Sequence, residues 1–286
     1  MAEFRFQIVF LNLKSELCHL KCQPAMMARM QEAVAITRSV SAGLAQCELT
    51  FQERVPIDLE LARAQHGAYE RALAAAGYRV ERLDADASMP DAVFVEDMAI
   101  VFDELAILTR PGADSRRSEL PAIAAALAAY RPLQEIQRPA TVDGGDVLVA
   151  GRHVFVGRST RTNDAAATQM RRILDPFGYT VIQTGVREVL HLKSAVTALG
   201  DDRLLVNPQW IDAAAFSGFT LVDVAPEEPS AANVLRLADR VLVAKAYPRT
   251  ADRISALGVR VEIVDASELA KAEGALTCCS VIVPGL

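Results

Sequence analysis

Short apolar runs occur along the chain in pairs, and two or three polar residues separate the two members of each pair. The pairs lie at residues 99–109, 147–156, 196–206 and 234–244. Each run is rich in Val, Ile, Leu and Ala, and the residues between the runs are Asp, Glu, Gly and Arg. This pattern is typical of a β-hairpin, so we expect four hairpins of similar size.

A helical pattern and a further apolar run are expected after each hairpin. The predicted helices lie at residues 59–76, 163–178 and 249–257, and Asn163 is the expected cap of the second. The strand-like runs that follow them lie at residues 78–83, 179–183 and 259–264. The repeated unit is therefore strand–strand–helix–strand, and it returns about every 40–50 residues, a period typical of propeller-like or solenoid arrays.

Two closing pieces complete the series of repeats. Apolar runs at residues 33–37 and 280–283 stand before the first hairpin and after the last. We expect about five units arranged in a ring, in which the last strand pairs with the first and leaves no open sheet edge. An open α/β sheet with several hairpins is the alternative. The ring is favoured because the units are alike and no segment has the pattern of a connection that only crosses over between strands of one open sheet.

Composition places the chain among ordinary globular proteins. It has 286 residues, of which 51% are hydrophobic and 23% charged, enough for one large domain or two small ones with a sizeable core. The formal net charge of −6 and the lack of a Lys/Arg cluster argue against a nucleic-acid partner.

Cysteine usage and the apolar runs bear on the compartment. Five cysteines, two of them adjacent, form no disulfide framework and indicate a reducing environment. No stretch is long and apolar enough to span a bilayer, and the start lacks the pattern of a signal peptide. We expect a cytoplasmic protein without a membrane partner. Residues 1–29 are interpreted as an N-terminal extension, either peripheral or an over-extended gene start, and residues 30–286 as one catalytic domain.

Four chemically active residues occupy the same place in successive units. Asp97, Asp143, His191 and Cys278 each lie just ahead of a short apolar strand. If the units surround an axis, these side chains converge at one end of it. A thiol, an imidazole and two carboxylates in one pocket are the groups of a nucleophilic catalyst.

The adjacent pair Cys278 and Cys279 can place only one side chain in such a pocket, because side chains alternate along a strand. We assign Cys278 to the pocket and interpret Cys279 as a small core residue. The acidic pair Glu96 and Asp97 ends an apolar strand, where buried carboxylates require a cation. A guanidinium satisfies this requirement, since its fork of donors matches carboxylates. The sequence therefore indicates thiol attack on a planar, cationic, nitrogen-rich carbon.

From about Met30 to Val283 the chain resembles the dimethylarginine dimethylaminohydrolases, which belong to the pentein superfamily of guanidino-modifying proteins. Six motifs carry the resemblance: Pro90-Asp91-Ala-Val-Phe94-Val-Glu96-Asp97, Thr109-Arg-Pro-Gly-Ala-Asp-Ser-Arg116-Arg117, Asp143-Gly-Gly-Asp146, Gly157-Arg-Ser-Thr-Arg161-Thr-Asn163, Leu190-His191-Leu-Lys-Ser194 and Leu276-Thr-Cys278-Cys-Ser280. The resemblance implies a five-bladed, pseudo-symmetric α/β propeller and hydrolysis of Nω-methylated L-arginine to L-citrulline and a methylated amine. It implies no metal and no cofactor.

The resemblance also implies roles for individual residues. Cys278 would attack the guanidinium carbon, and His191 would protonate the departing amine and then activate water against the covalent thiouronium intermediate. Asp143 would orient His191. The implied substrate-binding residues are Leu49 in a lid, Asp91, Glu96 and Asp97 around the guanidinium, Phe94 packed against it, Arg116 and Arg161 on the substrate carboxylate, and the backbone around Ala272 at the α-amino group.

Lys193 separates the subfamilies. Arginine deiminases, agmatine deiminases and amidinotransferases, which the chain also resembles, carry a second guanidinium-binding carboxylate at this position. Losing an acceptor suits a guanidinium whose nitrogen has lost its N–H donors to methyl groups. This favours methylated over free arginine as the expected small-molecule substrate.

Three alternatives stay open. One is a deiminase or hydrolase of another guanidino compound. Another is a zinc hydrolase with Cys278, His191 and Asp143 as ligands, although no local zinc motif is present. The third is a silent binding protein on the same fold. A homodimer is one assembly compatible with all of these interpretations.

Overall fold

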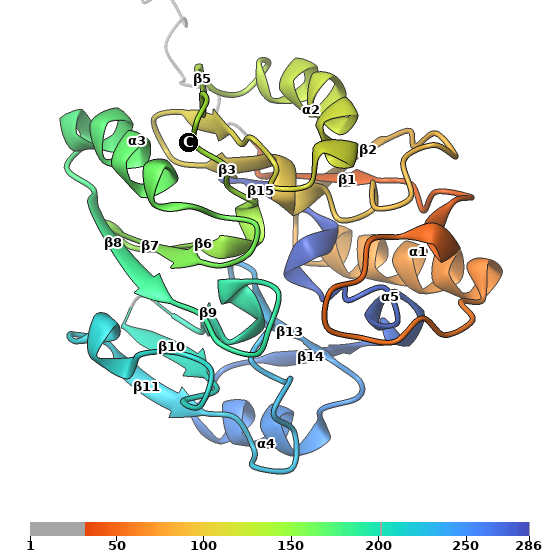
Figure 1. Ribbon diagram of the computed structural model, residues 1–286. Helices are drawn as coiled ribbons and strands as arrows, with labels where there is room; N and C mark the ends of the chain where they lie inside the picture. The colour runs from red at the N-terminus through yellow and green to blue at the C-terminus, as the bar shows by residue number, and fades with distance from the viewer. Residues whose placement is uncertain (1–31, 201, 286) are drawn as a thin grey trace, which may run out of the picture. The chain divides into compact units, whose positions relative to one another are not determined.

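Five three-stranded sheets form the structure, a computed structural model that describes residues 32–200 and 202–285 (Figure 1). Residues Glu32–Leu286 form one unit. The predicted extension at residues 1–29 lies outside the described residues. The sheets, in their order of hydrogen-bonded strands, are β3 (Ala99–Val101), β4 (Ala106–Leu108) and β5 (Leu133–Glu135); β6 (Val147–Ala150), β7 (His153–Arg158) and β8 (Thr180–Gly185); β11 (Thr220–Asp223), β10 (Arg203–Val206) and β9 (Val196–Ala198); β12 (Leu235–Arg236), β13 (Val241–Ala244) and β14 (Val261–Val264); and β15 (Val281–Val283), β1 (Val34–Arg38) and β2 (Arg79–Leu83).

All five sheets share one topology. The first two strands of each sheet are antiparallel, and the third strand runs parallel to the second. The four predicted hairpins are confirmed as the antiparallel pairs. The five-bladed α/β propeller is confirmed as the fold class.

The fifth sheet joins distant parts of the chain. Val34 pairs with Val283, and β1 pairs in parallel with β2. The predicted pairing of the last strand with the first is therefore confirmed. The prediction that no sheet edge stays open is wrong, because this pairing completes one blade and the five sheets remain separate.

Helices cover the outer side of the blades. They are α1 (Leu59–Ala75), α2 (Leu120–Leu127), α3 (Asp164–Leu174), α4 (Pro248–Ala256) and the short α5 (Ser267–Ala270). Local signals fix their ends: the Asp58 carboxylate caps α1 by accepting the amides of Glu60 and Leu61, each at 3.0 Å, and Gly77 ends it with φ +90°.

The expectation of a helix after every hairpin is wrong for one blade. Between β10 and β11 the chain forms only the 3-10 turn Ala213–Phe216. This connection is short and carries Pro208 and Gly218 near its ends, which leaves little room for an α-helix. In contrast, the Ala-rich helix α2 was not predicted, although Pro121 stands in its first turn, where proline is tolerated.

Apolar clusters lie between neighbouring blades. The residues that surround the axis are those at the starts of the inner strands. Each of four inner strands, β3, β6, β9 and β15, follows a 3-10 turn either directly or after one residue. The four turns are Val95–Met98, Gly144–Asp146, Leu192–Ser194 and Thr277–Cys279, and they pack against one another in sequence around the axis. This arrangement places the residues of the turns at one end of the ring.

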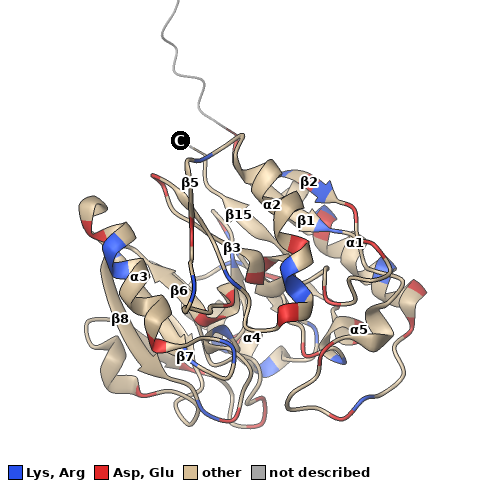
Figure 2. Ribbon diagram, turned by 45° about the horizontal axis from the view of Figure 1, so that its top comes forward, with Lys and Arg blue, Asp and Glu red and all other residues tan. Residues whose placement is uncertain are grey.

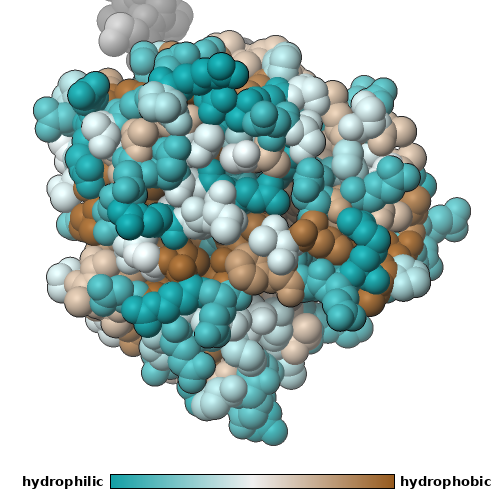
Figure 3. Space-filling view, viewed as in Figure 1, coloured by the Kyte–Doolittle hydropathy of each residue, from teal (hydrophilic) through white to brown (hydrophobic). Residues whose placement is uncertain are grey.

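The face of the described residues in Figure 3 is mostly hydrophilic, and charges of both signs are spread over the structure. Figure 2 shows Lys and Arg interspersed with Asp and Glu, and Figure 3 shows apolar residues in small separate groups on one face. Among the described helices, none combines the length and apolar character needed to cross a bilayer.

Candidate active site

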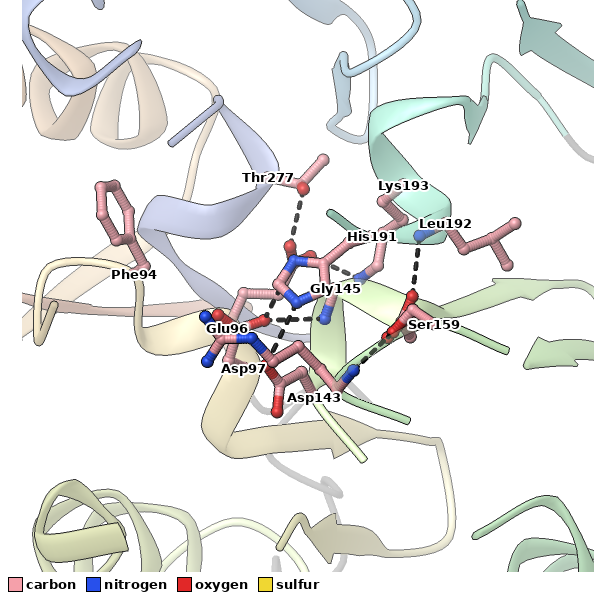
Figure 4. Close-up of polar contacts among 12 residues, drawn as sticks. Phe94, Glu96, Asp97, Asp143, Gly145, Ser159, His191, Leu192, Lys193 and Thr277 are labelled. Carbon is pink, nitrogen blue, oxygen red and sulfur yellow. Dashed lines mark hydrogen bonds and ion pairs between the residues drawn. The ribbon is translucent and has the colours of Figure 1, made fainter. Parts of the chain in front are cut away.

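The four predicted residues meet around one small cavity. Asp97 lies in the first 3-10 turn and Cys278 in the last, while Asp143 and His191 immediately precede the other two turns as their N-cap residues. All four line the same pocket, and all four are buried. The four residues therefore converge at the strand starts, as the repeat predicted, and Figure 4 shows three of them, Asp97, Asp143 and His191, close together.

His191 lies between two carboxylates. Its Nε2 atom is 3.1 Å from Asp143 Oδ2, and its Nδ1 atom is 3.9 Å from Asp97 Oδ1. Burial alone would lower the pKa of His191, but Asp97, the hydrogen bond to Asp143 and the nearby Asp146 outweigh it and raise the pKa to about 9. The imidazole is therefore protonated at neutral pH and can donate a proton.

Asp97 is held in place as an ionised acceptor. The Gly145 amide donates to its Oδ1 atom at 3.0 Å, and Arg116 donates to its Oδ2 atom at 2.5 Å. Burial opposes ionisation, but His191 and Arg116 outweigh it and hold the pKa of the Asp97 carboxyl below its usual value. Asp143 is fixed in a similar way, because the Gly112 amide donates to its Oδ1 atom at 2.8 Å.

Cys278 is a protonated thiol in the protein alone. Burial, with the charges of Glu96 and Asp97, raises the pKa of Cys278 to about 12. Cys279 is buried away from the pocket, and its Sγ atom donates to the Ala275 carbonyl at 3.4 Å. Cys278 therefore lies in the pocket and Cys279 in the core, as expected from the sequence. The stated reason, strand alternation, is wrong because both cysteines lie in a 3-10 turn ahead of β15.

Glu96 does not reach the pocket, contrary to its predicted place around the guanidinium. The Lys193 ammonium donates to its Oε1 atom at 2.5 Å, and Thr277 Oγ1 donates to its Oε2 atom at 2.7 Å. Burial raises the pKa of Glu96 although Lys193 acts in the opposite direction. The carboxylate thus lines a separate axial cavity, and its cation is Lys193 rather than a substrate.

Arg116 lines the pocket but has partners on each of its three nitrogens. Besides Asp97, it donates to both carboxylate oxygens of Glu119 at 2.9 Å and to the carbonyls of Asp91 and Phe94 at 3.1 and 2.9 Å. This guanidinium balances the charge of Asp97. Arg161 also lines the pocket, and its guanidinium donates a 3.4 Å hydrogen bond to Thr50 Oγ1.

The remaining predicted residues divide between the pocket and the core. Asp91, Phe94 and Ala272 line the pocket, whereas Leu49 packs against the apolar cluster beside it. Burial raises the pKa of Asp91 to about 6, although Arg116 and the Glu48 amide act in the opposite direction. The pocket residues that sequence analysis missed are Glu48, Leu190, Glu273 and Gly274. Adjacency to His191 could have revealed Leu190, but nothing local to the sequence marks the others.

Asp146 is a supporting residue that the motif contained without an assigned role. It accepts the Leu192 amide at 2.9 Å, and the hydroxyls of Ser159 and Thr162 at 2.5 and 2.6 Å. Figure 4 labels two of these donors, Leu192 and Ser159. Burial raises its pKa to about 6. Because Leu192 follows His191, Asp146 fixes the backbone that carries the imidazole.

The fifth unit contributes Asn233, which precedes β12 as the four site residues precede their strands. Its Nδ2 atom donates to the Lys193 carbonyl at 3.1 Å and to Thr277 Oγ1 at 3.0 Å, and its Oδ1 atom accepts the Thr277 amide at 3.0 Å. Asn233 therefore ties the turn before β9 to the turn that carries Cys278.

A metal-ligating arrangement was one alternative. In the described part of the chain, Asp97, Asp143 and His191 offer ligand atoms within 4.8 Å of one another. This set differs from the predicted zinc set, which used Cys278. Arg116 and the protonated His191 already balance the two carboxylates, so the donor set is satisfied by protein groups.

Replacing Lys193 with methionine is expected to lower the free energy of unfolding by about 3 kcal/mol, because removing one partner of a buried ion pair leaves the other charge uncompensated. The side chains of Lys193 and Glu96 are only 15% and 11% exposed. Urea unfolding of the variant measures the change. Lys245→Met is the control: it breaks the pair with Asp265, whose side chains are 70% and 41% exposed, and should change the free energy by less than about 0.5 kcal/mol. Equal losses in the two variants would contradict the role given to burial.

Comparison with known proteins agrees with the site. A family model described as N,N dimethylarginine dimethylhydrolase, eukaryotic, matches residues 45–273. An N(G),N(G)-dimethylarginine dimethylaminohydrolase of Streptomyces coelicolor is 41% identical over 254 residues, covering 88% of this chain and 97% of that protein.

Solved structures give the same result. A dimethylarginine dimethylaminohydrolase adduct with S-methyl-L-thiocitrulline superimposes with a TM-score of 0.84 at 35% identity, covering 89% of this chain and 100% of the other. A cysteine-to-serine mutant from Pseudomonas aeruginosa complexed with citrulline gives 0.82 at 34% identity over the same shares. The residues, the fold and the likeness agree, and the chain belongs to the dimethylarginine dimethylaminohydrolase family.

Proposed function

We propose that this chain hydrolyses Nω-methylated L-arginine, as asymmetric dimethylarginine or monomethylarginine, to L-citrulline and dimethylamine or methylamine. The observation that carries the proposal is the convergence of Cys278, a protonated His191 and the ionised Asp97 on one buried pocket. The likeness to a protein complexed with citrulline supports the product. The reaction uses protein groups and water only.

Cys278 is the proposed nucleophile. As the substrate cation binds, the Cys278 thiol releases its proton to water. The Sγ thiolate then attacks the guanidinium carbon, and the C–N bond to the methylated nitrogen breaks as His191 gives its proton to the departing amine. The neutral imidazole then takes a proton from water, and the resulting hydroxide attacks the covalent thiouronium carbon. The C–S bond breaks, the proton of the added hydroxyl passes to the departing sulfur, and citrulline leaves with the thiol restored.

The substrate itself resolves the high pKa of the thiol. A guanidinium cation beside Cys278 places a positive charge against the sulfur and favours the thiolate, whereas Glu96 and Asp97 disfavour it in the protein alone. Nucleophile activation therefore follows substrate binding. Asp143 keeps the imidazole in place through the 3.1 Å contact to Nε2.

Recognition divides between the two ends of the substrate. At the guanidinium, Asp97 and Asp91 are the proposed acceptors and the Phe94 ring forms a wall. At the amino-acid end, Arg161 binds the carboxylate and the backbone at Ala272 meets the α-amino group. The placement of Glu96 against Lys193 takes one acidic acceptor away from the pocket, which suits a nitrogen that carries methyl groups instead of N–H donors.

The test uses purified protein with asymmetric dimethylarginine, monomethylarginine and free arginine, each followed for citrulline and for dimethylamine, methylamine or ammonia. Citrulline with a methylated amine is the expected result. Ammonia from free arginine would support the deiminase alternative and contradict the interpretation of Lys193. The absence of turnover with all three compounds would exclude the proposed function.

The rate should fall at alkaline pH as His191 loses its proton. Carboxylates raise the pKa of His191 to about 9, so the acid form is present below that pH and is lost above it. We expect kcat/KM to decline above about pH 9. In Asp143→Asn the hydrogen-bonded negative charge is removed, the imidazole pKa falls, and the decline should begin at lower pH. A decline at the same pH in both proteins would exclude His191 as its cause.

A further inference from the structure

The pocket around Cys278 is too small for the proposed substrate. Its volume is about 20 Å³, which is close to the space of one water molecule. Sites for small organic ligands typically measure about 300 Å³ or more. One wall of the pocket therefore has to move before an amino acid of the size of arginine can enter.

The segment 48–56 is a wall of the pocket that is exposed over most of its length, although the Glu48 amide donates to both oxygens of Asp91 at 3.2 Å. Glu48 lines the pocket, and residues 50–56 are all exposed. In Figure 1 this segment is part of the orange loop that passes beside α5. Segments with few buried contacts open at low free-energy cost, so hydrogen bonds decide whether this one stays closed. We name residues 48–52 the lid.

One carboxylate holds most of the lid. Glu273 accepts the amide of Thr50 at 3.0 Å, that of Phe51 at 2.5 Å and that of Gln52 at 2.7 Å. The lid and Glu273 are far apart in the sequence, and these contacts join the first blade to the turn ahead of Cys278. Three successive amides on one ionised carboxylate form a charge-assisted set, which is stronger than bonds between neutral groups.

The backbone at Glu273 is unusual in a way that points to its side chain. Glu273 has φ +57° at the end of α5, where its amide donates to the Ala270 carbonyl and the Gly274 amide donates to the Leu269 carbonyl. Glycine is the usual residue at this left-handed position. Here the glycine comes one residue later, because a Cβ atom at Gly274 would clash with the Phe94 ring. A disfavoured backbone that aims a carboxylate at the lid fits a functional role.

Glu273 also stands between two cavities. It lines the pocket of Cys278 and a neighbouring cavity of about 290 Å³, whose walls include Phe51 and Gln52 of the lid. Leu190 and Gly274 line both cavities as well. The contact of Glu273 with the lid is therefore part of the partition between the small pocket and the larger cavity.

We propose that Glu273 is a positioning residue that holds the lid closed over the substrate pocket, and that release of its three amide bonds joins the pocket to the neighbouring cavity for substrate entry. The identity of the substrate rests on the proposed function; the closure of the lid does not.

The test compares Glu273→Gly and Glu273→Gln with the parent protein. Glycine removes the carboxylate, which costs stability, and relieves the left-handed backbone, which restores it, so the melting temperature should stay near that of the parent protein while the lid is released. Glutamine keeps one acceptor oxygen without the charge, so its effect on the lid should lie between those of the parent protein and Glu273→Gly. Glu188→Gly is the matched control, because Glu188 also has a positive φ of 61° and lines the larger cavity, yet its side chain makes no hydrogen bond among the described residues.

Two readouts follow the lid. Hydrogen exchange at the amides of residues 50–52 should be at least about tenfold faster in Glu273→Gly, a factor that corresponds to about 1.4 kcal/mol. With methylated arginine, KM should rise about tenfold while kcat stays within about twofold. Glu188→Gly should match the parent protein in both measurements.

Unchanged hydrogen exchange at residues 50–52 in Glu273→Gly would overturn the proposal. A fall of about tenfold in kcat with KM unchanged would also overturn it. The exchange measurement needs no substrate. If the parent protein turned over none of the three arginine compounds but exchange accelerated in the variant, the proposed function would fail and the inference about the lid would stand.

Discussion

Replacing Cys278 with serine is expected to abolish turnover of methylated arginine, with a loss on the order of 10⁴-fold or more, as for the removal of a nucleophile from a catalytic set that acts as one unit. The serine hydroxyl is a far weaker nucleophile than a thiolate, and the substrate cation cannot ionise it near neutral pH. Citrulline release measures the loss. Mass spectrometry of rapidly quenched reactions should show a covalent adduct in the parent protein and none in the variant.

Cys279→Ala is the matched control for this experiment. Cys279 stands beside the nucleophile but is buried away from the pocket, so the substitution should cost stability through a small cavity and leave the adduct in place. Loss of the adduct in Cys279→Ala with retention in Cys278→Ser would reverse the assignment of the two cysteines.

Gly145→Ala is expected to lower kcat/KM roughly 10³-fold, through displacement of the general acid. A Cβ atom at this position would lie 2.5 Å from His191 Nδ1, 2.8 Å from His191 Cγ and 3.0 Å from Asp97 Oδ1. The clash cannot be relieved by a small movement of a flexible side-chain end, because the imidazole ring is held by Asp143 on its opposite side. The imidazole and Asp97 must therefore both shift, although neither has been replaced.

The control for that prediction is Gly185→Ala, at the end of β8. An added Cβ atom there meets no atom within 4 Å, and the position does not require a positive φ. Its kcat/KM should stay within about twofold of the parent value, as for other surface substitutions. Normal activity in Gly145→Ala would mean that the imidazole can act from a shifted position, which would contradict the geometry given for His191.

The repeating units could be predicted because each one appears in the sequence as short apolar runs separated by turn residues. Val147–Ala150 lies within the pair of runs expected at residues 147–156, and Val281–Val283 lies within the run expected at residues 280–283, since short apolar runs between turn residues leave few alternatives. The meeting of Asp97, Asp143, His191 and Cys278 followed from their equivalent places ahead of such strands. Symmetry of the units, rather than any single motif, made that prediction.

Side-chain pairing across blades could not be predicted in the same way. Whether Glu96 faces a substrate or Lys193 depends on a contact between residues 97 positions apart. The sequence around Glu96 and the sequence around Lys193 are compatible with both arrangements. The same holds for Arg116, whose partners include both Glu119 nearby and the carbonyls of Asp91 and Phe94. Glu273 illustrates the limit best, since an acidic residue after a short helix gives no sign that its carboxylate holds a loop.

The pairing of β15 with β1 ties catalytic competence to the last stage of assembly. Cys278 stands just ahead of β15, whose Val283 must find Val34 across nearly the whole chain. Contacts between such distant residues form late, because loop closure has to precede them. A nascent chain can thus complete four blades, with His191 and Asp143 in position, and still carry no nucleophile. Turnover would report that the ring has closed, and a partly synthesised or partly unfolded chain would keep its reactive thiol apart from the groups that act with it.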